Sequence, residues 1–284
     1  MRLFILIGIN FLFMHLHASG NISKYINMKY SYVSKMAMII LGIFTIMEFY
    51  IYLKEDPDRE HHDHHHHDDC DCGHDHSHEN KGWRKYVMYL LLLFPVFTGI
   101  FLPVATMDSN IVDKKGFNFS VYDDSDPYSS HQFLQPDTSL YYGKDQYLTL
   151  MEKSRDQLLH KNGLTLNDSN YLKDLEIIYS YPGEFTGKQM TLTGFSYQNS
   201  EGLDPNQVFL FRFGIIHCVS DSGVFGILVD MPKDLHPQND EWYTVTGELE
   251  TMYYQPFKKT IPVLKVSSYT KMEQPEEPYV YRKY

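Results

Sequence analysis

The chain has 284 residues, which is room for about two domains, and a formal net charge of −11. Because the excess charge is acidic and no stripe of Lys and Arg is present, we expect no nucleic acid among its partners. Three cysteines are too few for a disulfide scaffold. Apolar residues crowd the N-terminal third and polar residues dominate the remainder, which predicts a membrane anchor followed by a soluble domain.

Three apolar runs predict about three transmembrane helices that cross the lipid bilayer, at residues 3–18, 33–53 and 86–106. The first run is short for a hydrocarbon core about 30 Å thick. Arg2 and the small residues 18–20 would also suit a cleaved signal peptide, although the bulky residues 15–17 are atypical of a cleavage site. The predicted helical region therefore comprises residues 1–54 and 83–107.

The flanks of the third run predict the orientation of the chain. Arg84 and Lys85 precede this run, whereas the acidic Asp108 follows it. By the positive-inside rule, the loop at 54–85 lies in the cytoplasm and the C-terminal domain lies outside a bacterial cell membrane.

Glu48 is a carboxylate within the second apolar run. A carboxylate at this depth is costly if it faces lipid, so it indicates an intramembrane functional residue that contacts a partner or lines an ion path. The alternative is an interfacial carboxylate that is hydrogen-bonded to water or to Tyr50.

The segment at 55–82 has a low-complexity composition and is not expected to pack a core. It contains nine of the fifteen histidines and two of the three cysteines, with carboxylates close by. Neutral imidazole and thiolate are good ligands for divalent metals such as zinc, and nearby carboxylates raise the local cation concentration. The candidate metal ligands are His61, His62, His64, His65, His66, His67, Cys70, Cys72, His74, His76 and His78.

The spacing of these ligands differs from that of a structural zinc site, so we expect several weak, exchangeable sites. The segment 70–74, with the sequence CDCGH, is the candidate for a tighter one. An expression tag is a poor alternative, because tags are not interrupted by Asp and Cys or placed between two spans. A solvated spacer without a metal role remains the other interpretation.

Residues 108–164 predict a linker followed by a helix at 146–160, and a second helix is predicted at 171–181. Alternating patterns then predict five short strands bounded by Gly, Pro, Asn and Asp. The strands are expected at 189–197, 208–219, 224–230, 242–253 and 261–268. Five strands in this space predict a small β-barrel of the OB kind over 165–272, with a β-sandwich as the alternative and an acidic, Tyr-rich tail at 273–284.

With these residues in view, the chain resembles the DUF1980 (YcgQ-like) family of permease subunits. The most specific part of the resemblance is YPGEFTGKQMTLTGFSY and FLFRFGIIHCVSDSGVFGILVD, supported by FLFMHLHASGNISKYIN and the His-rich loop. The resemblance implies a separate multi-span permease as partner and no assigned catalytic activity. Many such relatives have a Cys-Cys pair where this chain has His217 and Cys218, followed by Asp221; these three residues are either a second soft-ligand site or strand-end packing.

No enzyme template is visible, since the sequence lacks G-x-S-x-G, a P-loop, a dinucleotide fingerprint and H-E-x-x-H. The first functional hypothesis is a non-catalytic accessory subunit of a permease-type transport complex that handles or senses divalent metal, zinc being the expected ion. The alternative hypothesis is a membrane-tethered OB-type interaction module of the cell envelope whose His-rich loop is incidental.

Overall fold

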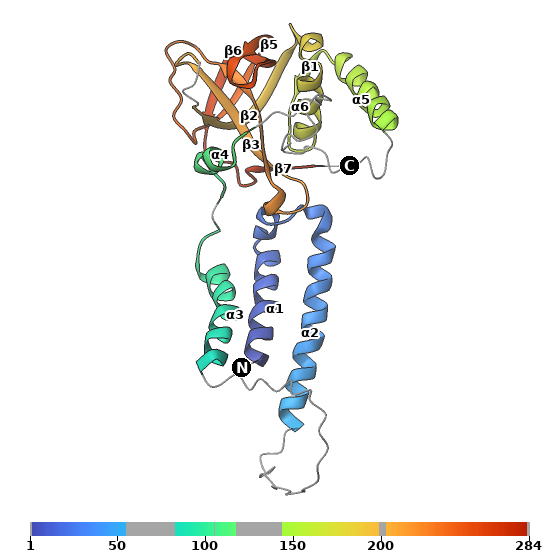
Figure 1. Cartoon of the computed structure of the whole chain (residues 1–284), viewed down its shortest axis with the longest axis vertical. Helices are drawn as coiled ribbons and strands as arrows, with labels where there is room; N and C mark the ends of the chain where they lie inside the picture. The colour runs from blue at the N-terminus through green and yellow to red at the C-terminus, as the bar shows by residue number, and fades with distance from the viewer. Residues whose placement is uncertain (1, 55–82, 105, 118–143, 199–202, 283–284) are drawn as a thin grey trace, which may run out of the picture. The chain divides into compact units, whose positions relative to one another are not determined.

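The computed structural model of the chain describes residues 2–54, 83–104, 106–117, 144–198 and 203–282. The chain forms two compact units (Figure 1). The helical unit comprises residues 1–22 and 28–105, and the barrel unit comprises residues 23–27 and 106–284. The short segment Ser23–Asn27 thus belongs to the barrel unit, although it lies between two helices of the helical unit in the sequence.

In its described residues the helical unit contains three α-helices. They are α1 (Arg2–Ala18), α2 (Ser31–Lys54) and α3 (Trp83–Phe101), and the 3-10 turn η2 (Met28–Tyr30) precedes α2. The 3-10 turn η1 (Asn21–Lys24) begins in the helical unit and ends in the barrel unit. Helix α1 packs against both other helices. A Cβ atom added at Gly99 of α3 would lie 2.8 Å from Leu12 of α1, so the helices approach each other closely where a residue is small, as is usual for helices packed in lipid.

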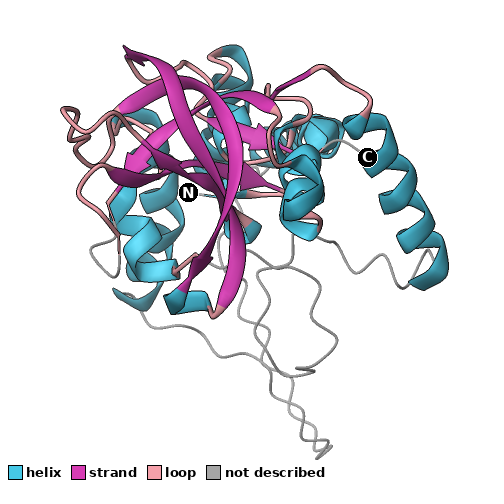
Figure 2. Cartoon of the chain, turned by 90° about the horizontal axis from the view of Figure 1, so that it is seen from above, coloured by secondary structure: helices cyan, strands magenta, loops and turns pink. Residues whose placement is uncertain are grey.

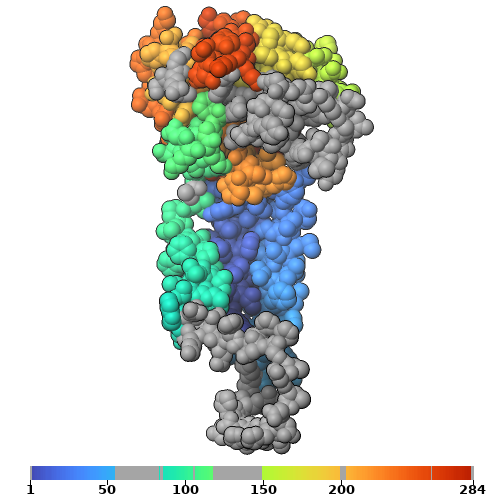
Figure 3. Space-filling view, in the orientation of Figure 1, coloured from blue at the N-terminus to red at the C-terminus, as the bar shows by residue number. Residues whose placement is uncertain are grey.

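Most large apolar side chains of these helices are exposed. Figure 3 shows the helices in space-filling form, coloured from blue (α1 and α2) to green (α3). Among the described residues, only the stretch Met28–Lys54 is long and apolar enough to cross a membrane. The apolar helices at Arg2–Ala18 and Tyr86–Phe101 are shorter. By length and composition, the structure therefore supports one membrane-spanning helix instead of the three that the sequence predicted. The third run is shortened because α3 ends at Phe101, two residues before Pro103.

The barrel unit is organised around a closed five-stranded β-barrel (Figure 2). Its strands are β2 (Gln189–Tyr197), β3 (Gln207–Ile215), β4 (Gly223–Asp230), β5 (Trp242–Tyr254) and β6 (Lys259–Met272). They pair in the order β2-β5-β6-β4-β3, and β3 pairs again with β2. All pairs are antiparallel except β4 with β6. The small closed barrel predicted from the strand pattern is confirmed.

Other elements cover or extend the barrel. They are α4 (Ser109–Lys115), α5 (Lys144–Leu159), β1 (Gly163–Thr165), α6 (Tyr171–Ser180), η4 (Pro182–Phe185), η5 (Val219–Asp221), η6 (Gln255–Phe257) and β7 (Tyr279–Tyr281). The strand β7 pairs in parallel with the end of β3, so part of the predicted tail is an ordered piece of the sheet. The helix α6 is almost wholly buried.

The strand β3 has an unusual pattern for a barrel strand. Every residue from Val208 to Ile215 is buried, so both faces of the strand are covered. On one of these faces, Phe117 packs its ring against Phe209 and Phe211 at centroid distances of 4.9 and 5.0 Å. OB barrels present ligand-binding residues on their second and third strands, which here are β3 and β4. The aromatic residues of β3 are therefore core residues and are not available for stacking on a base.

Candidate functional site

The described polar contacts concentrate at a place that we call the junction. It consists of the segment Ser23–Asn27, the turn 216–222 between β3 and β4, and the C-terminal residues 277–282. All three parts belong to the barrel unit. Two backbone hydrogen bonds join the segment to the turn: Asn27 N donates to His217 O at 2.9 Å, and Val219 N donates to Tyr25 O at 2.8 Å. Together they form an antiparallel bridge that sets Ile26 opposite Cys218.

Asn27 is the best-buried polar residue of the segment, with 4% of its surface exposed. Its side-chain nitrogen donates to the carbonyl of Ile216 at 2.9 Å and to the carbonyl of Arg282 at 3.2 Å. A side-chain amide has two N–H donors, and here each one has an acceptor. One side chain thus ties the segment to both the turn and the C-terminus.

Ser23 makes the second connection to the C-terminus. Its hydroxyl donates to Glu277 Oε1 at 2.6 Å, and its carbonyl oxygen lies 2.8 Å from the hydroxyl of Tyr281. That hydroxyl is also 2.9 Å from Glu277 Oε2. Burial, followed by the nearby Glu277 carboxylate, raises the pKa of Tyr281, so its hydroxyl keeps its proton and remains a donor.

His217, Cys218 and Asp221, which the sequence suggested as a second soft-ligand site, lie in the turn of the junction. Asp221 accepts hydrogen bonds from the backbone nitrogens of His217 at 2.9 Å and Cys218 at 3.0 Å, and from His217 Nδ1 at 2.7 Å. The carboxylate is thereby engaged in shaping its own turn. Across the described residues, no group of three or more His, Cys, Asp or Glu side chains could hold a metal ion. The structure thus brings His217 to Asp221 without assembling a metal centre here.

The other predicted site residues divide into two groups. The candidate ligands between His61 and His78 lie outside the described residues. Glu48 lies on α2, is partly exposed, and has no hydrogen bond or ion pair with another described residue. One polar contact between α1 and α2 was not foreseen: His17 Nε2 is 2.8 Å from Ser34 Oγ.

A second segment, which follows α3 in the sequence, is also fixed to the barrel. Asp240 accepts hydrogen bonds from the backbone nitrogen of Ser109 at 2.7 Å and from its hydroxyl at 2.6 Å. The ammonium of Lys115 donates to the carbonyl and the hydroxyl of Ser222, each at 3.0 Å. Because Ser222 belongs to the turn 216–222, this turn holds both the segment after α3 and the segment between α1 and α2.

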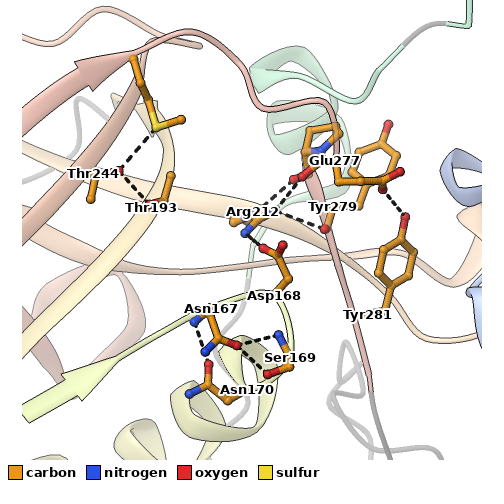
Figure 4. A network of polar contacts seen from close by, with 12 residues as sticks. Asn167, Asp168, Ser169, Asn170, Thr193, Arg212, Thr244, Glu277, Tyr279 and Tyr281 are labelled. Carbon is orange, nitrogen blue, oxygen red and sulfur yellow. Dashed lines mark hydrogen bonds and ion pairs between the residues drawn. The ribbon is translucent and has the colours of Figure 1, made fainter.

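Arg212 of β3 supports the junction from inside the barrel unit (Figure 4). It is 4% exposed and forms an ion pair with Asp168, which precedes α6. The same guanidinium donates to the carbonyls of Glu277, Pro278 and Tyr279 at 2.8, 3.3 and 3.2 Å. A buried guanidinium with this many acceptors is satisfied, and it fixes the C-terminal residues that contact the segment Ser23–Asn27.

Together these features define a class of protein. It has a helical region that includes a candidate membrane span, and a small β-barrel that binds the segment between α1 and α2 and the segment after α3. The DUF1980 N-terminal domain matches residues 1–118, and the DUF1980 C-terminal domain matches residues 141–282. The chain belongs to the DUF1980 family, as its sequence resemblance indicated.

Two relatives match over almost the whole chain. The Bacillus subtilis (strain 168) protein named "UPF0703 protein YcgQ" is 49% identical over 282 residues, covering 99% of each chain. A Streptococcus mutans protein named "Putative two-component membrane permease complex subunit" is 35% identical over 287 residues, covering 99% of this chain and 98% of the relative. Neither name describes a catalysed reaction.

Proposed function

We propose that this protein is a non-catalytic, membrane-anchored subunit of a permease complex, and that its partner is a separate multi-span permease. The observation that carries the proposal is the similarity to the Streptococcus mutans relative, because it extends over 99% of this chain. The barrel supports the same function by its burial pattern: β3, on the ligand-binding side of OB barrels, is covered on both faces.

The membership of Ser23–Asn27 in the barrel unit supports a specific membrane topology. The stretch Met28–Lys54 starts next to this segment, so when it crosses the membrane its end at Lys54 lies on the side opposite to the barrel. The chain re-enters the barrel unit at residue 106. This topology requires a return crossing between residues 55 and 105, and we propose that α3, although shorter than a full span, makes it.

The short length of α3 is compatible with this crossing. Its apolar part, Tyr86–Phe101, extends roughly 24 Å at 1.5 Å per residue, and a helix shorter than the hydrocarbon core is accommodated by local thinning or by association with other helices. Close packing on α1 through Gly99 supplies such an association. We propose that α1 spans as the third helix in the same way.

The orientation follows from the charges beside α3. Arg84 and Lys85 at its start favour a cytoplasmic location for residues 55–82, which places the barrel unit outside the bacterial cell membrane. Lipid then covers one part of the apolar surface of the helices, and the permease covers the other part.

We further propose that the loop 55–82 handles or senses divalent metal for the complex, with zinc as the expected ion. The support is its composition, since imidazole and thiolate ligands alternate with carboxylates from His61 to His78. In the alternative function, a tethered interaction module of the envelope, this loop has no role in metal handling.

Co-purification tests the proposed function. The full chain, tagged at its C-terminus and expressed at native level, is extracted from its own membranes in mild detergent and its partners are identified by mass spectrometry. The proposal predicts a multi-span membrane protein in a fixed ratio to the bait, together with zinc in the purified complex. Recovery of envelope proteins without any multi-span partner would contradict it and favour the tethered module.

A further inference from the structure

We infer that the segment Ser23–Asn27 is a latch, meaning a releasable contact through which the barrel unit holds the turn between α1 and α2. The geometry of the latch is a property of this chain alone. Only its role, to link the helices to the barrel within a working permease complex, rests on the proposed function.

The first argument is the chemistry of the contact. The segment is attached by backbone hydrogen bonds, by the amide of Asn27 and by the hydroxyl of Ser23. Its two large apolar side chains are only partly covered: Ile26 is half-buried and Tyr25 is 36% exposed. Protein–protein hydrogen bonds exchange with protein–water hydrogen bonds at a small net free energy. Because neither Tyr25 nor Ile26 is fully buried, the segment covers less apolar surface than a core strand does, and water can replace its hydrogen bonds when the segment leaves.

The barrel differs in this respect. Its strands bury a continuous cluster of large apolar side chains, so a strand cannot leave without exposing that cluster to water. Contacts with few buried apolar atoms open at lower free energy than the global unfolding of a domain. The latch is thus expected to open while the barrel stays folded.

The second argument is the position of the turn 216–222. It contacts the latch through Val219 and Cys218, and it contacts the segment after α3 through Ser222. When the latch opens, the turn 216–222 loses its hydrogen bonds to Ser23–Asn27 but keeps those to Lys115. The turn 216–222 therefore changes its contacts when the latch segment moves relative to the segment that follows α3.

The bridge between Ile26 and Cys218 allows the latch to be locked. Opposed residues of an antiparallel pair have Cα atoms about 4.5–5.5 Å apart, which lies within the range that a disulfide spans. The substitution Ile26→Cys supplies a second thiol, and C70S and C72S remove the competing ones. An added diazene oxidant takes up the two protons and two electrons that the thiols release as the disulfide forms.

The test is hydrogen–deuterium exchange on the full-length protein in lipid nanodiscs, with reduced and oxidised I26C/C70S/C72S compared. The latch predicts that amides of 23–27 and 216–219 exchange together in the reduced protein and faster than those of β3 and β4. Oxidation should slow amide exchange in 23–27 and 216–219 by about tenfold or more and leave the exchange rates of the barrel strands unchanged. The variant N27A, which removes the side-chain hydrogen bonds of Asn27, should speed amide exchange in the same two segments.

Three outcomes would overturn the inference. If 23–27 exchanges as slowly as β3 and β4, the segment is a permanent part of the core. If 23–27 and 216–219 exchange at unrelated rates, they do not form one contact. If I26C does not react with Cys218 on oxidation, as shown by thiol counting with C218S as the control, the bridge is not formed. None of these outcomes depends on a permease partner, so failure of the latch and failure of the proposed function are distinguishable.

Discussion

The helical unit and the barrel unit bury opposite kinds of surface. Ile46 on α2 and Leu90 on α3 are 69% and 70% exposed, whereas Leu210 on β3 and Ile227 on β4 are fully buried. A water-soluble fold cannot leave so many large apolar side chains outside without a cover. The difference indicates that the barrel packs its own apolar core, whereas the apolar surface of the helices needs a cover such as lipid or other helices.

The first prediction tests the barrel side of this comparison and has the largest expected effect. A Cβ added at Gly247 of β5 would lie 2.1 Å from the carbonyl oxygen of Lys265, beside the bulge between Thr246 and Gly247. Gly247→Val should therefore cost about 3 kcal/mol or more of unfolding free energy, or prevent folding. Gly183→Ala is the matched control, because nothing lies within 4 Å of its added Cβ. Equal thermal stability of the two variants would contradict the closed register of β5 with β6.

The second prediction tests the helical side. Ile46→Asp places a charge on an exposed apolar surface of α2 and should cost about 2.5–3.5 kcal/mol of membrane insertion, because a carboxylate is poorly solvated in lipid. Tyr253→Asp alters a similarly exposed residue of β5 and should change stability by less than about 0.5 kcal/mol. Membrane fractionation and a glycosylation-based insertion assay measure the first effect. Normal insertion of the Ile46 variant would mean that this face of α2 meets water.

The third prediction concerns the segment between α2 and α3 in the sequence. Residues 61–78 should bind several zinc-like ions with micromolar or weaker affinity, and only the first ion should use Cys70 and Cys72. Under reducing conditions, C70S/C72S should remove the tightest phase of a calorimetric titration and leave the His phases. The tightest site that remains should then bind about tenfold more weakly than in the parent. All phases should weaken from neutral pH toward pH 5, since imidazole has a reference pKa of about 6.5. Identical titrations of parent and variant would exclude a distinct site at 70–74.

The fourth prediction is a smaller effect on acid stability in the barrel unit. Hydrogen bonds from Lys271 and then Tyr243 lower the pKa of Glu241 from its ordinary value of 4.5 to about 2. Because the folded-state pKa is the lower one, Glu241 stabilises the fold above pH 4.5 and loses this contribution as pH falls toward 2. Glu241→Gln should cost about 1–2 kcal/mol at neutral pH and flatten the acid limb of the melting-temperature profile. Glu250→Gln, at an exposed ion pair with Lys265, is the control and should leave that limb unchanged.

The strands were predictable from the sequence because their physical signal is local. Residues 189–197 and 242–253 alternate apolar and polar side chains, and the structure places strands at Gln189–Tyr197 and Trp242–Tyr254. The helices at Lys144–Leu159 and Tyr171–Ser180 were found in the same way. Each of these elements is long enough for its period to be visible without knowledge of its neighbours.

The junction, and the helix α4 that contacts its turn at 216–222, could not be predicted in this way. The segment Ser23–Asn27, the helix α4 and the strand β7 are short, and polar contacts with residues far away in the sequence hold them in place. Their residues show no period, so the sequence placed them within the predicted transmembrane region at 1–54, the linker and the tail. An Asn and a Ser do stand beside the end of an apolar helix, but both residue types are common in ordinary turns. Their presence therefore cannot identify a hydrogen-bond acceptor 189 residues away.

The most direct test of this account is the membrane topology that follows from placing Ser23–Asn27 in the barrel unit. Reporter fusions after Lys81 and after Tyr284, each with a cytoplasmic and an extracytoplasmic reporter, measure the sides of the loop and of the barrel. The account predicts a cytoplasmic signal after Lys81 and an extracytoplasmic signal after Tyr284. Signals from the same side at both positions would mean that α2 and α3 do not separate the loop from the barrel, and would contradict the account.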